Sequence, residues 1–154
     1  MNTIADIHEK WMRAALSEAR RAFDLGEIPV GAVVVRDGAI ISSGHNTRET
    51  SGDPTGHAEI IALRQAAQTL GDWRLSGCVL YVTLEPCPMC AGAVLAARIE
   101  RVIYGARDER QGCCGSLYRL TEDPAFDHFA RASGGVMEAE CASLLRQFMA
   151  LSRQ

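Results

Sequence analysis

Two short stretches carry residue types that could bind a metal and move protons. "GHAEIIALRQ" contains His57 and Glu59, and "TLEPCPMCAGAVL" contains Cys87 and Cys90. Pro88 suits the first position of a helix, because the N–H that proline lacks would have no partner there. The two cysteines would then share one helix face, near a positive helix end that favours the thiolate form. The second stretch therefore predicts a pair of metal-binding thiolates.

His57 is expected to complete this set from a second helix start. It lies 30 residues before Cys87, also where a loop gives way to a helix. One imidazole and two thiolates with an open fourth position are typical of catalytic zinc. Glu59 is too close in sequence to His57 to be a comfortable fourth ligand, but it is well placed beside a metal-activated water. We therefore predict a Zn²⁺ cofactor, with Glu59 as the proton-transfer group.

The rest of the chain must place these two helix starts at one end of a sheet. After a predicted hairpin, strands and helices alternate, which favours parallel pairing with helices on both faces. Asp37-Gly38 is a strong turn signal for that hairpin. The fold class expected is α/β, a three-layer α/β/α domain. The pattern predicts helices over 5–25, 57–70, 88–97 and 139–151, strands over 30–44 (two, joined by the turn), 78–84, 101–106 and 134–138, and a loop up to residue 56.

Composition limits the classes of protein that fit. The length of 154 residues predicts one domain, 1–154, and no apolar run reaches the roughly 18 residues of a membrane span. The N-terminus has no signal-peptide pattern, so the six cysteines are expected in a reducing cytoplasm. A net charge of −3 means that nucleic-acid binding would need a local basic patch. The candidates for that patch are Arg107, Arg110, Arg146 and Arg153.

The two stretches together form H-x-E…P-C-x-x-C, the signature of zinc-dependent nucleobase deaminases. The chain resembles the bacterial tRNA-specific adenosine deaminases of the TadA type, in the cytidine/deoxycytidylate deaminase superfamily, along nearly its whole length. The matching stretches are "EIPVGAVVV", "GHN", "DPTGHAEIIALRQ", "RLSGCVLYVTLEPCPMCAGAV", "RIERVIYGARD" and "GSLY".

This resemblance implies a fold, an activity and a set of roles. The fold would be cytidine-deaminase-like with a five-stranded mixed sheet, and the protein would be a homodimer. The activity would be hydrolytic deamination of adenosine to inosine at the wobble position of a tRNA anticodon, with a zinc-activated water. The implied zinc ligands are His57, Cys87 and Cys90, and Glu59 is the proton shuttle. The implied substrate contacts are Asn46 with the flipped base, Leu84 in its pocket and Asp108 with a ribose hydroxyl.

Three features depart from the family pattern. Asp127-His128 stands where the family shows Asn-His, Cys113-Cys114 replaces small residues, and the C-terminal helix has fewer basic residues. They leave open a second hypothesis, a zinc deaminase of a free nucleobase or nucleoside of the guanine or cytosine type. A third hypothesis is a non-enzymatic structural zinc module. Glu59 argues against it, because a structural site has no use for a buried, unpaired carboxylate.

Overall fold

The computed structural model describes residues 3–152, which form one mixed sheet covered by helices. The elements are helix α1 (Ile4–Asp24), strands β1 (Gly31–Arg36) and β2 (Ala39–His45), helices α2 (Arg48–Ser51) and α3 (Ala58–Leu70), strand β3 (Val79–Leu84), helix α4 (Pro88–Ala96), strand β4 (Arg101–Ala106), the 3-10 helix η1 (Leu120–Glu122), strand β5 (Arg131–Ser133) and helix α5 (Glu138–Ser152).

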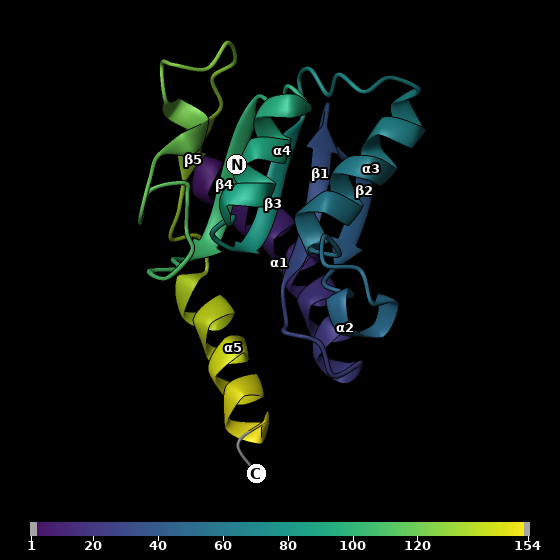
Figure 1. Cartoon of the computed structure of the whole chain (residues 1–154), viewed down its shortest axis with the longest axis vertical. Coiled ribbons are helices and arrows are strands. Elements are labelled where there is room, and N and C mark those ends of the chain that lie inside the picture. Colours follow the sequence, from purple (N-terminus) through teal and green to yellow (C-terminus); the bar gives the residue numbers. More distant parts are fainter. Residues whose placement is uncertain (1–2, 153–154) are drawn as a thin grey trace.

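The sheet has five strands in the order β2-β1-β3-β4-β5. The β1 strand pairs antiparallel with both β2 and β3, whereas β3, β4 and β5 run parallel. Helices α3 and α4 cover one face of the sheet and α1 lies behind the other, with α5 extending past the sheet's end (Figure 1). The predicted three-layer α/β/α fold with a five-stranded mixed sheet is confirmed.

Local sequence explains the first half of the fold. Helix α1 begins at a capping box in which Thr3 and Asp6 each accept the other's backbone N–H. The hairpin turns at Asp37 and Gly38, whose φ angles of 51° and 75° fit a type I′ turn. Both sequence signals therefore form the structures that they predict.

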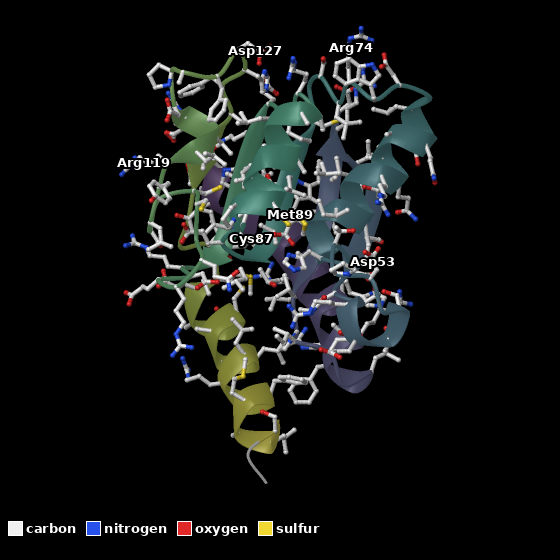
Figure 2. The ribbon with its side chains drawn as sticks, viewed as in Figure 1. Asp53, Arg74, Cys87, Met89, Arg119 and Asp127 are labelled. Atoms are coloured by element: carbon white, nitrogen blue, oxygen red, sulfur yellow. The ribbon has the colours of Figure 1, made fainter. Side chains whose placement is uncertain are left out.

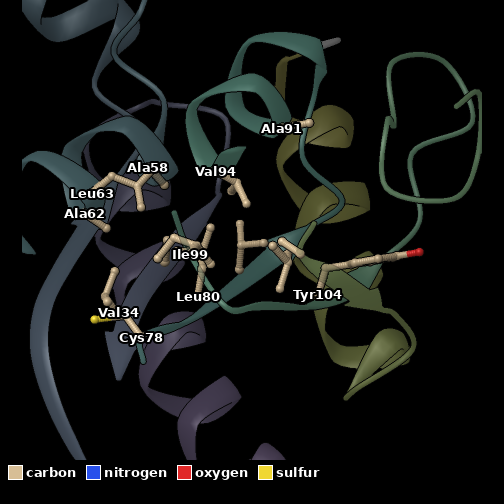
Figure 3. Close-up of a cluster of buried hydrophobic side chains, with 14 of the residues drawn as sticks. Val34, Ala58, Ala62, Leu63, Cys78, Leu80, Ala91, Val94, Ile99 and Tyr104 are labelled. Carbon is tan, nitrogen blue, oxygen red and sulfur yellow. The ribbon is translucent and has the colours of Figure 1, made fainter. Parts of the chain in front are cut away.

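Two hydrophobic clusters, one on each face of the sheet, hold the layers together. On the α1 side, Met12 and Leu16 pack against Val33, Tyr81 and Ile103. The larger cluster lies under α3 and α4, and Figure 3 shows part of it. Its labelled members are Val34, Ala58, Ala62, Leu63, Cys78, Leu80, Ala91, Val94, Ile99 and Tyr104. These contacts hold α3 and α4 against the neighbouring strands of the sheet.

Two expectations about the elements are wrong. The last strand is Arg131–Ser133, residues 134–137 form the connection to α5, and Glu138 is already the first residue of that helix. Gly135 and Met137 have φ angles of +93° and +52°, which lie outside the extended region of regular strands. Gly134 passes so close to the Tyr104 ring that a Cβ would lie 2.1 Å from it. The expected loop before residue 56 contains the short helix α2.

No helix within residues 3–152 is both long enough and apolar enough to span a membrane.

Candidate active site

The three predicted metal ligands lie together at two helix starts. His57 is the N-cap of α3 and Cys87 is the N-cap of α4, with Cys90 in the first turn of α4. The ligand atoms all lie within 4.8 Å of one another. Each sulfur is 3.5 Å from Nδ1 of His57. Tetrahedral zinc with ordinary Zn–S and Zn–N bonds separates such atoms by about 3.5 Å. The donor set and its spacing therefore fit zinc, and His57, Cys87 and Cys90 would hold it.

The polar groups at this point change one another's proton affinity. Hydrogen bonding from Cys90, and also from His57, lowers the pKa of the Cys87 thiol to about 4. Burial raises the pKa of the Glu59 carboxyl to about 7, and the negative charge of Cys87 adds to this effect. Glu59 is 4% exposed. A thiolate ligand and a buried carboxyl that can carry a proton thus stand side by side.

A cavity of about 150 Å³ opens beside the three ligands. The predicted residues His57, Glu59, Cys87, Asn46 and Leu84 all line it. Its other lining residues are Ile28, Val30, Arg48, Ala58, Glu85 and Gln111. Apolar walls with a few polar groups and a metal position are typical of a site for a small ligand.

Asn46 is buried and already bonded to the main chain. Its Nδ2 donates to the carbonyl of Ile28 at 3.2 Å, and its Oδ1 accepts the N–H of Arg48 at 3.2 Å. An amide has two N–H donors and an oxygen with two lone pairs. One donor and one lone pair of Asn46 therefore remain for a ligand, and the main-chain bonds hold the side chain in one orientation.

Asp108 does not line this cavity. It lines a wider groove of about 780 Å³ that runs between residues 106–110 and α5 and shares Ile28 and Leu84 with the cavity. Oδ1 of Asp108 accepts the N–H groups of Arg110 and Gln111, at 3.0 and 3.1 Å, and so stabilises its own turn. Arg107 and Arg110 of the predicted basic patch line the same groove, Arg146 is exposed on α5, and Arg153 lies outside the described residues.

The Asp127-His128 departure lies away from the cavity. Asp127 pairs with Arg98 at 3.3 Å, just beyond the C-terminal end of α4, and Nε2 of His128 is 2.7 Å from the carbonyl of Ile99. Figure 2 shows Cys87 at one end of α4 and Asp127 beyond the other. Cys113 and Cys114 are buried and free of disulfides. The departures therefore leave the arrangement of metal ligands unchanged.

Sequence reasoning missed two buried glutamates that position the walls of the cavity. Glu27 accepts the N–H groups of Glu49 and Thr50 and so holds α2 near Asn46. Glu85 accepts N–H groups of the segment that follows β4. The available signal was position, since Glu85 is an acidic residue between a buried strand and the Pro86-Cys87 pair.

Comparisons with known proteins agree with this geometry. The profile of the MafB19-like deaminase family matches residues 7–136. The chain is 48% identical over 140 residues to the tRNA-specific adenosine deaminase of Bacillus subtilis, which covers 91% of this chain and 87% of that protein. The chain belongs to the tRNA-specific adenosine deaminase family. Family membership and the His/Cys/Cys set together identify a zinc-type deaminase site.

Solved structures of deaminases have the same fold. A tRNA:A34 deaminase, studied for A-to-I editing at the wobble position, superposes with a TM-score of 0.84 at 44% identity, covering 88% of this chain and 98% of that one. The guanine deaminase of Bacillus subtilis superposes with a TM-score of 0.63 at 46% identity, covering 70% of this chain and 66% of the other. Both a tRNA deaminase and a free-base deaminase therefore resemble this chain.

Proposed function

We propose that this protein deaminates adenosine to inosine at the wobble position of a tRNA anticodon. The observation that carries the proposal is the small cavity at the His57, Cys87 and Cys90 set, which shares Ile28 and Leu84 with a larger groove. A single extruded base would enter the cavity and its flanking nucleotides would occupy the groove. Membership of the tRNA-specific adenosine deaminase family supports this assignment.

Each residue of the site would have a distinct role in the proposed deamination. Zinc held by His57, Cys87 and Cys90 would supply Lewis acidity that makes water a better nucleophile. Glu59 takes a proton from the attacking water, delivers it to N1 of adenine as oxygen bonds to C6, and helps protonate the leaving amine. One water is consumed and one ammonia is released. Asn46 would bond to the base and Leu84 would contact its face, while Asp108 would accept a bond from a ribose hydroxyl in the groove.

A symmetric dimer is part of the proposal. An apolar hollow of about 320 Å³ lies on the outer face of α3 and α4, lined by Ile60, Leu63, Arg64, Ala67, Trp73, Ala93, Ala96 and Ala97. Trp73 is 53% exposed at its edge. A second copy of the chain would cover this surface and enlarge the area available to an anticodon loop. A tRNA substrate would place the enzyme in the cytoplasm.

The second candidate is a free-base deaminase, which the similarity to the guanine deaminase favours. The deciding experiment compares an anticodon stem-loop RNA, the same hairpin in DNA, free adenosine and free guanine at low and high salt. We expect inosine formation mainly in RNA, with a rate that falls steeply as salt rises because phosphate contacts weaken. Faster turnover of guanine without salt dependence would establish the second candidate instead.

Asp108→Asn sharpens this experiment. The amide oxygen can still accept the N–H groups of Arg110 and Gln111, so the turn is preserved while the charge is lost. The Asp108 carboxylate can accept a hydrogen bond from the 2′-OH of an RNA substrate. DNA has no 2′-OH, so toward DNA the carboxylate would only repel the nearby phosphates. We therefore expect Asp108→Asn to narrow the difference in activity between the RNA and DNA hairpins.

A further inference from the structure

Glu85 is a buried carboxylate whose hydrogen bonds all come from one segment of the chain. It lies just after β3 and is 2% exposed. Its Oε1 accepts the N–H of Asp108 at 3.1 Å and the hydroxyl of Ser116, and its Oε2 accepts the N–H groups of Cys114 and Ser116 at 3.1 and 2.9 Å. No ion pair involves Glu85 among residues 3–152. Four donors to one buried anion make strong, charge-assisted bonds.

The segment 108–116 is shaped around this carboxylate. A Cβ at Gly112 would lie 2.3 Å from Cδ of Glu85, so only glycine allows the backbone to pass there. The N–H of Cys113 donates to the carbonyl of Pro86 at 2.8 Å, and just before the segment the carbonyl of Ala106, at the end of β4, accepts the N–H of Glu85 at 2.9 Å. Side chain and main chain thus bind the segment to the short stretch 85–86.

The same segment supplies surfaces that face the proposed substrate. Gln111 lines the cavity and Asp108 lines the groove. Cys87 lies only two residues after Glu85. The placement of Gln111 and Asp108 relative to the metal ligands therefore depends on the bonds of Glu85. One side chain thus bonds to both ends of the segment, at Asp108 and at Cys114 and Ser116.

We propose that Glu85 is a positioning residue that fixes the substrate-facing segment 108–116 against the start of α4. The inference rests on the proposed function, since it assigns the segment a part in substrate binding. In this role Glu85 keeps Gln111 and Asp108 at fixed positions relative to the metal ligands, and it does not itself touch the reacting atoms.

Glu85→Gln tests the proposal with almost no change in shape. The amide nitrogen must face N–H donors where an oxygen accepted them, so the segment loosens at one end. We expect the KM for the anticodon stem-loop to rise roughly tenfold, the effect of losing one charge-assisted bond. We expect kcat to change less and zinc content to stay at the wild-type level. Amide hydrogen exchange at Asp108, Cys114 and Ser116 should accelerate.

Two further variants separate positioning from general stability. Ser116→Ala removes one of the four bonds to Glu85 and should raise KM less than Glu85→Gln does. Glu122→Gln is the matched control, because Glu122 accepts the N–H of Ala132 and lines neither the cavity nor the groove. This control should leave KM and the exchange rates of the segment unchanged.

Several outcomes would overturn the proposal. Unchanged amide exchange in Glu85→Gln, loss of zinc in step with activity, or an equal KM change in Glu122→Gln would each do so. If the wild type turns over guanine and not RNA, the proposed function fails, while amide exchange and the KM for guanine still test the role of Glu85.

Discussion

Three buried glutamates illustrate how surroundings assign different work to one residue type. Burial alone would raise the pKa of each carboxyl. Hydrogen bonds from Glu49 and Thr50 outweigh burial at Glu27, and those from Ser116, Asp108 and Cys114 do so at Glu85, so that both pKa values are lowered. Burial dominates at Glu59 and its pKa rises to about 7. Of the three, Glu59 is the carboxyl suited to exchange a proton near neutral pH.

Replacing Glu59 should separate chemistry from metal binding. Glu59→Gln removes the proton carrier from the cavity but none of the three proposed metal ligands. We expect deamination to fall by roughly 10²–10⁴-fold, the usual scale for a positioned acid or base. Zinc content, measured by elemental analysis, should stay near one per chain. Cys87→Ala is the contrasting variant and should lose most of its zinc. An active Glu59→Gln enzyme would contradict the assigned role.

His8 should make stability depend on pH. Its Nδ1 is 2.8 Å from the Tyr81 hydroxyl, and burial, with a smaller contribution from Arg101, lowers its pKa below 6.5. The unfolded chain therefore takes up a proton at a higher pH than the folded chain does. The contribution of neutral His8 to the free energy of unfolding is therefore fully present above about pH 6.5, the pKa of the unfolded chain, and is lost as the pH falls below that value.

The measurement is thermal unfolding at about pH 7.5 and about pH 5.5 for wild type and His8→Gln. The wild type should lose more stability on acidification than the variant, since glutamine cannot take up the proton. Equal losses in the two proteins would show that His8 does not contribute.

At the scale of elements, the sequence predicts what local pattern encodes and misses what tertiary contacts create. The α3 and α4 starts and the Asp37-Gly38 turn have local signals, and so the metal ligands could be placed from sequence. The strand Arg131–Ser133 is too short for a periodic pattern and depends on β4 for its pairing. The bonds of Glu85 join residues more than 20 apart, which no local pattern reveals.

Helix α1 packs so closely on β1 that a single added methyl group should disturb the contact. A Cβ on Gly31 would lie 2.0 Å from the carbonyl oxygen of Ala15 and 2.4 Å from the amide nitrogen of Ala19. Both are helix backbone atoms, so α1 must move away from the sheet. We expect Gly31→Ala to lower the free energy of unfolding by at least about 2 kcal/mol, as overpacked cores do. Chemical denaturation measures this, and an unchanged midpoint would show that α1 shifts freely.

At the scale of the whole molecule, the apolar hollow on α3 and α4 predicts how two chains associate. Ala96 is exposed within this hollow. Ala96→Glu should therefore leave the single chain folded while placing a charge where a second copy would pack. We expect light scattering at micromolar concentration to show a dimer for wild type and a monomer for the variant. Ala150→Glu adds the same charge on α5 and should remain dimeric. A dimeric Ala96→Glu would place the interface elsewhere.

The hydrogen bonds of Glu85 to both ends of the segment 108–116 are also relevant to protein engineering. The bonds to Asp108 at one end and to Cys114 and Ser116 at the other leave Glu109, Arg110 and Gln111 between them with exposed side chains. These three positions can be randomised in a mutant library that selects for new substrate preferences. The residues that bond to Glu85 on either side, and the metal ligands, would stay unchanged. Transplanting the loop into another deaminase, in contrast, requires Glu85, Gly112 and Ser116 to be moved as one unit.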